Sequence, residues 1–377
     1  MKRWFLSLLL LGGAVDARAD CPQRDYWPTT EWRSRAELVR QTRKDQIAAL
    51  ESYAFARTGS EADHAGIRTD GVVIIHRGEI IYEKYAGGYS ASQRHLSWSV
   101  SKSFTNALVG VGVRDGLLSL DDSICKHRAL DDEAYCKIRV RDLLTMSSGI
   151  DWQETYEGTE LESSSVLAML YGVGRKDMMG FVSSHRLRDA PAETWMYSSG
   201  DSTLLAGVTA PPLRERYGDE YPWETLFDPI GMHSATWEAD HAGTYVGSSY
   251  VYATPRDLAK FGYLFLNDGC WETRRLLPEG WVGFSTKVNE PIKKRPLLRE
   301  PDDVYGAQFW LNKEVPEIGA TRPWPDVPDD AYAARGHWGQ SITVIPSRDA
   351  VVVRTADDRE KGFEFNKFLK LALEVIP

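Results

Sequence analysis

The stretch Ser99-Val100-Ser101-Lys102 places a hydroxyl and an amine one helical turn apart, at the start of an amphipathic run. Apolar residues recur at helical spacing through positions 100–111, which predicts a helix with Ser97 as its N-cap. A serine becomes a nucleophile only beside a base, and the three-residue spacing brings the lysine within reach. The first turn of the helix also favours developing negative charge.

The same spacing occurs a second time, so the pattern alone does not identify a nucleophile. Ser123-Ile124-Cys125-Lys126 follows two aspartates, includes a cysteine and opens no apolar-periodic run. We interpret this second copy as a loop. Taken alone, Ser99 fits equally well as a helix-start serine with a solvated lysine behind it.

Two later segments add polar groups of the kind that acyl transfer uses. Trp195-Met196-Tyr197-Ser198-Ser199-Gly200-Asp201 is typical of a loop that enters a helix. Arg335-Gly336-His337-Trp338-Gly339-Gln340 is followed by two β-branched runs around a short turn, which predicts a hairpin. The glycines on both sides of His337 indicate a close approach to the strand backbone. Each segment is weak evidence in isolation.

Their order along the chain resembles that of the serine β-lactamase and penicillin-recognising hydrolase superfamily: Ser-x-x-Lys, then Tyr-x-Ser, then His-x-Gly. The closest likeness is to the class C-like branch, which includes esterases, D-amino-acid-releasing peptidases and 6-aminohexanoate-dimer hydrolases. The resemblance runs from about Gly71 to near the C-terminus. The segments 116–122, 141–149 and 254–262 share in it.

The chain departs from the lactamase pattern at two positions. Ser199 stands where that pattern has asparagine, and His337 stands where it has lysine. Both residues are similar to those of the esterase and amidase relatives. The departures disfavour efficient β-lactam hydrolysis and leave the acyl-enzyme chemistry intact.

The resemblance implies a set of site residues. Ser99, Lys102 and Tyr197 would be catalytic, with either the lysine or the tyrosine as proton acceptor. The backbone N–H groups of Ser99 and Gln340 would bind the oxyanion. The substrate-binding and oxyanion set would be Ser199, His337, Gly339 and Gln340, and His337 would donate to a substrate carboxylate or to the tyrosine network.

The function expected from these residues is that of a serine hydrolase acting on an amide or ester without cofactor or metal. Linear amides such as 6-aminohexanoate-type oligomers, or short-chain esters, come first as substrates. A β-lactamase and a D,D-peptidase are the alternatives within the superfamily. A non-catalytic penicillin-binding-type sensor is the alternative of another class.

The expected fold is α/β, of the β-lactamase/D,D-peptidase type, with a mainly antiparallel sheet flanked by helices. Residues 20–96 and 255–377 would form the sheet domain, and residues 97–254 an inserted, mostly helical domain. The proline-rich stretch 312–330 is a long loop. We expect it to cover the cleft with Trp324, a surface excursion being the alternative.

The N-terminus predicts export. Lys2 and Arg3 precede a short apolar run, and residues 17–19 form a small-x-small cleavage site, so residues 1–19 are expected to be a signal peptide. A periplasmic or secreted protein would oxidise its four cysteines, with Cys125–Cys136 and Cys21–Cys270 as expected pairs. The formal net charge of −9 opposes binding to nucleic acid or to an anionic membrane. The expected partner is thus a small molecule, without membrane insertion after signal cleavage; the oligomeric state is left open.

Overall fold

A seven-stranded sheet forms the centre of the protein in a computed structural model, which describes residues 21–294, 304–360 and 362–377. The expected signal peptide lies outside the described residues. The strands are β1 (Arg33–Ser34), β2 (Thr69–His76), β3 (Glu79–Tyr85), β9 (Trp310–Leu311), β10 (Tyr332–Gly336), β11 (Gln340–Ile345) and β12 (Ala350–Ala356). Their order is β1-β3-β2-β12-β11-β10-β9, and all pairs are antiparallel except β1 with β3.

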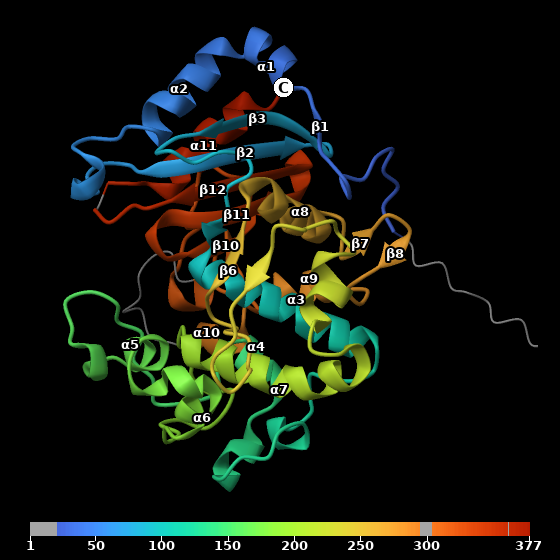
Figure 1. Ribbon diagram of the computed structural model, residues 1–377, viewed down its shortest axis with the longest axis vertical. Helices are drawn as coiled ribbons and strands as arrows, with labels where there is room; N and C mark the ends of the chain where they lie inside the picture. The colour runs from blue at the N-terminus through green and yellow to red at the C-terminus, as the bar shows by residue number, and fades with distance from the viewer. Residues whose placement is uncertain (1–20, 295–303, 361) are drawn as a thin grey trace, which may run out of the picture.

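Helices cover both faces of this sheet (Figure 1). The helices on one face are α1 (Ala36–Thr42), α2 (Lys44–Ala54) and α11 (Phe365–Val375), and α8 (Pro255–Leu266) lies on the other. The side chains of β2 alternate between the two apolar layers: Val72 and Ile74 contact the α2–α11 layer, whereas Val73 and Ile75 belong to the larger core on the α8 side. Because both faces are buried, this strand is apolar at consecutive positions.

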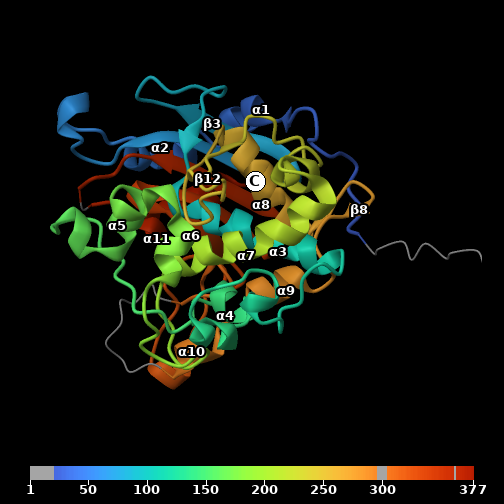
Figure 2. The same cartoon turned by 60° about the horizontal axis from the view of Figure 1, so that its bottom comes forward.

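A helical layer lies below the α8 side of the sheet. Its helices are α3 (Ser101–Arg114), α4 (Val140–Leu144), α5 (Ser165–Leu170), α6 (Met178–Ser183), α7 (Ser199–Tyr217), α9 (Trp281–Ser285) and α10 (Glu290–Lys293). Helix α3 packs against α7, and both views place them side by side (Figures 1 and 2). Phe104 of α3 meets Phe261 of α8 with ring centroids 4.1 Å apart. Helix α3 is therefore packed between the sheet layer and the rest of the helices.

Two small sheets complete the described strands. One contains β4 (His95–Leu96), β5 (Thr236–Trp237) and β6 (Val251–Ala253), and the other pairs β7 (Cys270–Trp271) with β8 (Arg274–Arg275). The first of them joins the strand before Ser97 to the segment after Ser248. It thereby holds the segment that leads into α3 beside the segment that leads into α8.

The expected α/β fold with a mainly antiparallel sheet is confirmed. Before the long proline-rich loop, only Trp310–Leu311 pairs as a strand. Ser97 precedes the first turn as expected, but its side chain makes no capping hydrogen bond and lies 3.3 Å from the Ser101 hydroxyl. The proposed division into two domains stays a prediction.

The expectation that Trp324 covers the cleft is wrong. Its indole is 1% exposed and packs edge-on against Phe365 of α11, with ring centroids 5.1 Å apart. The Asn312 side chain holds the loop back by bonding the Trp324 N–H at 2.8 Å and carbonyl at 2.9 Å. A large apolar ring gains more from the buried α11 layer than from a solvated position.

Both expected disulfides are present, Cys21–Cys270 and Cys125–Cys136. The first ties the start of the described chain to β7, and the second closes a short loop after α3. Among the residues described, no helix has the length and apolar character needed to cross a bilayer.

Candidate active site

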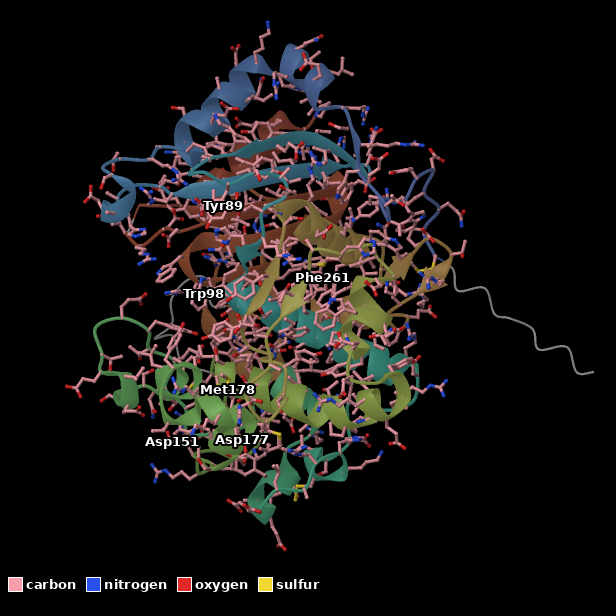
Figure 3. The ribbon with its side chains drawn as sticks, viewed as in Figure 1. Tyr89, Trp98, Asp151, Asp177, Met178 and Phe261 are labelled. Atoms are coloured by element: carbon pink, nitrogen blue, oxygen red, sulfur yellow. A yellow bond between two sulfur atoms is a disulfide. The ribbon has the colours of Figure 1, made fainter. Side chains whose placement is uncertain are left out.

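Ser99 lies in a short 3₁₀ turn, Trp98–Val100, directly before α3. Bonds to β6 fix both ends of this turn: the Ser97 N–H donates to the Val251 carbonyl at 2.9 Å, and the Val251 N–H donates to the Ser101 hydroxyl at 3.1 Å. Trp98 adopts φ +50°, a region that bulky residues seldom occupy. Figure 3 places Trp98 at the boundary between the sheet and the helical layer. Backbone strain of this kind is concentrated at functional sites.

Lys102 is the buried base candidate. It is 1% exposed, and its ammonium contacts three oxygens: Ser99 Oγ at 2.9 Å, Ser199 Oγ at 3.0 Å and the Ser248 carbonyl at 3.2 Å. Burial lowers the pKa of Lys102 to about 8, while the negative charge of Glu154 opposes that fall. The neutral amine is therefore a minor form at pH 7 and reaches about half of the population near pH 8, and a neutral amine can accept a proton.

Tyr197 comes from the segment that enters α7 and meets the same two groups. Its hydroxyl is hydrogen-bonded to Ser99, and the Lys102 ammonium lies 4.9 Å from the centroid of its ring. The ring stacks on Trp310 at 5.3 Å. Burial raises the pKa of the Tyr197 phenol far above its usual range, the charge of Glu154 adds to that rise, and the bond to Ser99 opposes it. The phenol is thus a proton-bearing group at neutral pH.

These contacts bring together four predicted residues from two distant segments: Ser99, Lys102, Tyr197 and Ser199. Ser199 is fully buried at the first position of α7. Its hydroxyl contacts Lys102, where the lactamase pattern would place an asparagine amide. The convergence that the sequence motifs predict is therefore present in the fold.

The third predicted segment forms the tight connection between β10 and β11. Gly336 allows β10 to approach the Trp98–Val100 turn, because a Cβ there would lie 2.2 Å from the Ser97 carbonyl oxygen. Trp338 and Gly339 follow with φ of +56° and +90°. The Gln340 side chain accepts from the Ala356 N–H at 3.0 Å and donates to the Ala356 carbonyl. This side chain therefore anchors the strand.

His337 lies beside the site and is paired with a carboxylate. Its Nε2 is 2.9 Å from Glu157 Oε1, and its ring stacks on Tyr156 at 4.8 Å. Burial lowers the pKa of His337, and the charge of Glu157 opposes that change. Tyr156 in turn bonds Glu154 at 2.7 Å and lies 3.4 Å from Ser199 Oγ. Whether His337 donates to a substrate carboxylate or to the tyrosine network stays a prediction. A pocket of 510 Å³ opens next to His337; its other lining residues include Arg335, Gly339, Arg359 and Phe363.

Glu154 is a site residue that the sequence did not indicate. Its carboxylate accepts from the Ser199 hydroxyl at 2.6 Å and the Ser199 N–H at 2.8 Å. Trp152 Nε1 and the Tyr156 hydroxyl donate to it at 2.6 and 2.7 Å. It lies in a loop between α4 and α5 without periodicity or a recognisable motif, so only the three-dimensional contacts could find it.

A second buried carboxyl, Asp201, lies two residues after Ser199 in α7. It accepts from the Ser148 hydroxyl at 2.8 Å and from the Ser148 N–H at 3.3 Å. Burial raises its pKa to about 7, and these hydrogen bonds only partly oppose that rise. The group supports the start of α7 and touches none of the three predicted catalytic side chains.

The beta-lactamase family profile matches residues 45–373. The chain belongs to the beta-lactamase family. A curated relative, the 6-aminohexanoate-dimer hydrolase of Paenarthrobacter ureafaciens, is 25% identical over 297 residues, covering 76% of this chain and 72% of the relative.

Solved structures show the same fold. A putative 6-aminohexanoate-dimer hydrolase from Bacillus anthracis has a TM-score of 0.62 and 21% identity, covering 82% of this chain and 78% of its own. A D-stereospecific amidohydrolase from Streptomyces sp. has a TM-score of 0.57 and 18% identity, covering 86% and 97%. This beta-lactamase-family protein is accordingly an enzyme of the serine hydrolase type.

Proposed function

We propose that the protein is an exported amidase or esterase that hydrolyses linear amides or short-chain esters through an acyl-enzyme on Ser99. The observation that carries this proposal is the 2.9 Å contact between Ser99 Oγ and a buried Lys102 whose pKa is lowered to about 8. A serine hydroxyl at that distance from a partly neutral amine is an activated nucleophile.

In the first step, Ser99 Oγ attacks the substrate carbonyl carbon while its proton passes to Lys102 Nζ. Lys102 is the better acceptor of the two candidates. Its burial favours the neutral amine, whereas the same burial disfavours the Tyr197 phenolate. The carbonyl oxygen becomes an oxyanion, which the backbone N–H groups of Ser99 and Gln340 are assigned to bind; one such donor supplies about 3 kcal/mol.

In the second step, the bond to the leaving group breaks and an ester forms between the acyl group and Ser99. The Lys102 ammonium returns its proton to the leaving nitrogen or oxygen, with the Tyr197 hydroxyl as the relay. Water then attacks the ester, and Lys102 takes one of its protons. The bond between the acyl carbon and Ser99 Oγ breaks, Lys102 passes that proton to Ser99 Oγ, and the acid product is released. No step needs a metal or an organic cofactor.

The substrate class follows from the relatives and from two substituted positions. The curated relative is named for hydrolysis of a linear amide dimer. Ser199 and His337 replace the asparagine and lysine of the lactamase pattern, so β-lactamase and D,D-peptidase activities rank below amide or ester hydrolysis. His337 and the adjoining 510 Å³ pocket are assigned to the substrate, its acidic end included.

Export is part of the proposal. It is supported by the charged, apolar and small-residue order of residues 1–19 and by two disulfides that link all four cysteines. A fusion of residues 1–30 to a periplasmic reporter should be exported, and retention of the reporter in the cytoplasm would contradict this part.

A turnover assay tests the chemistry. The protein is incubated with p-nitrophenyl acetate and butyrate, linear aminohexanoate amides and nitrocefin. We expect continuous release from an ester or linear amide, and loss of at least about 10³-fold in Ser99→Ala. Release that stops after one equivalent would instead identify a non-catalytic binder, and faster turnover of nitrocefin would identify a β-lactamase.

A further inference from the structure

The hydrogen bonds around Glu154 have a fixed direction. Four donors converge on its carboxylate, two on each oxygen: the Ser199 and Tyr156 hydroxyls on Oε1, and the Ser199 N–H and Trp152 indole N–H on Oε2. An ionised carboxylate accepts hydrogen bonds and donates none. The Ser199 hydroxyl proton is therefore committed to Glu154.

That commitment decides how Ser199 meets the catalytic amine. With its proton on the Glu154 side, the Ser199 oxygen presents lone pairs to Lys102 Nζ at 3.0 Å and accepts from it. The Ser248 carbonyl is a second obligatory acceptor, at 3.2 Å. Two N–H groups of the Lys102 amine therefore donate to these two oxygens. The remaining tetrahedral position on Nζ points toward Ser99 Oγ at 2.9 Å. In the neutral amine this remaining position is the lone pair.

We propose that Glu154 is a positioning residue that acts through Ser199 to aim the lone pair of neutral Lys102 at the Ser99 hydroxyl. The inference rests on the proposed acyl-enzyme function and deepens it. Glu154 is the first member of a chain of contacts, Glu154–Ser199–Lys102–Ser99, in which each bond sets the direction of the next. The carboxylate itself need not touch the substrate.

The charge of Glu154 has a separate, measurable effect on the same amine. It raises the pKa of Lys102 against the effect of burial. Tyr197 also faces the amine; burial raises the pKa of its phenol, the charge of Glu154 adds to that rise, and the nearby Arg335 only partly opposes it. Removal of the Glu154 charge should therefore shift the Lys102 titration to lower pH, which a purely structural role would not do.

Glu154→Gln offers a nearly isosteric test of direction. The indole and backbone N–H groups can only donate, so the glutamine carbonyl must take the Oε2 position and its NH₂ must take the Oε1 position. The NH₂ then donates to Ser199 Oγ, and the hydroxyl proton turns away. The closest remaining acceptor is the Lys102 lone pair at 3.0 Å, against 3.4 Å for the Tyr156 oxygen.

Glu154→Asp provides the complementary variant, since it is shorter yet still accepts only. If direction matters, aspartate retains more activity than glutamine. If side-chain shape alone matters, glutamine retains more than aspartate. Glu160→Gln removes a charge at an exposed position on the same connecting segment and serves as the matched control.

The experiment measures kcat/KM for a p-nitrophenyl ester from pH 6 to 10 in the native protein and in these three variants. The same profile is measured for Ser199→Ala and for the double variant that combines Ser199→Ala with Glu154→Gln. We expect Glu154→Gln to lose about 10- to 100-fold and to move the acidic limb of the profile to lower pH. Glu154→Asp should lose less, and Glu160→Gln should match the native protein. In the Ser199→Ala background, Glu154→Gln should cost less than about threefold, because the intermediary is gone.

Three outcomes would overturn the inference. The first is native-like activity of the Glu154→Gln variant, and the second is a higher activity of Glu154→Gln than of Glu154→Asp. The third is an equal loss of kcat/KM on Glu154→Gln substitution whether residue 199 is serine or alanine. Thermal melting of each variant checks that it folds. If Glu154→Gln lowers the melting temperature, the kcat/KM of Glu154→Asp relative to that of Glu154→Gln tests the inference. Absence of turnover in the native protein would instead refute the proposed function, so the two failures are distinguishable.

Discussion

At the scale of single residues, burial determines what the polar groups of the site can do. Lys102 is an ordinary lysine in the sequence, and its spacing from Ser99 is all that marks it. Only the fold removes it from water and lowers its pKa to about 8. The same burial makes Tyr197 a persistent proton bearer. The sequence therefore predicted which groups meet, whereas their division into acceptor and donor depends on the environment.

The first prediction concerns the pH dependence of acylation. In the proposed mechanism the neutral form of Lys102 is the active one, so kcat/KM should rise with pH and level off above about 8. Lys102→Arg, which keeps its proton throughout this range, should lose at least about 10³-fold. Stopped assays of ester hydrolysis from pH 6 to 10 measure both. A flat profile in the native protein would show that no group of this pKa controls the reaction.

The second prediction concerns stability and Asp201. Its folded pKa of about 7 exceeds the ordinary carboxyl value, so the folded state keeps a proton that the unfolded state has lost between about pH 4 and 7. The free energy of unfolding therefore falls as pH rises through that window. Asp201→Asn should remove this fall and melt at a higher temperature than the native protein at pH 8. Asp131→Asn, at an exposed position, is the control. A native-like melting curve for Asp201→Asn at pH 8 would argue against the buried carboxyl.

At the scale of elements, the connection between β10 and β11 explains why glycines flank His337. The glycine pattern predicted a close approach, and two such approaches are present. Gly336 lies against the nucleophile turn, and Gly339 lies against the buried Arg354 and Asp358, whose side chains pair at 2.6 Å. Arg354 also donates to the Gly339 carbonyl at 3.1 Å. This ion pair fixes the strand that carries the Gln340 N–H.

The third prediction tests that support. In Gly339→Ala, the new Cβ would lie 2.3 Å from Arg354 Nη1, at a φ of +90° that alanine disfavours. We expect a fall of at least about tenfold in kcat/KM and a loss of about 1–3 kcal/mol in the free energy of unfolding. Gly283→Ala, inside α9 where a Cβ meets no atom within 4 Å, should lower neither. Denaturant melts and ester kinetics measure the free energy of unfolding and kcat/KM of the two variants. Equal values in both variants would contradict the role of the Arg354–Asp358 ion pair in supporting this strand.

At the scale of the whole molecule, the sequence predicted most of the architecture and part of the site. Periodicity and turn residues predicted the helix that became α3 and the hairpin of β11 and β12. Glu154 was not predicted as a site residue, because a single carboxylate in an aperiodic loop forms no recognisable sequence pattern. Trp324 was misplaced because a sequence does not tell which face of a sheet a proline-rich loop covers. Long-range packing decided both.

The fourth prediction concerns the two disulfides, which close loops of very different length. Cys21–Cys270 joins residues 249 positions apart, and Cys125–Cys136 joins residues 11 apart. The longer loop restricts the unfolded chain more, by about 2–3 kcal/mol. Cys21→Ser with Cys270→Ser should therefore lower the melting temperature more than Cys125→Ser with Cys136→Ser. Calorimetry of the two paired variants measures this; the reverse order would mean that local packing outweighs chain entropy.

The central claim is that the Ser99 hydroxyl is the nucleophile, and peptide mapping of a covalent adduct tests it most directly. The native protein is treated with a fluorophosphonate, digested and analysed by mass spectrometry, with Ser99→Ala treated in parallel. We predict one adduct per chain, on Ser99, and no labelling of the alanine variant. An adduct on another residue, or equal labelling of both proteins, would contradict the account.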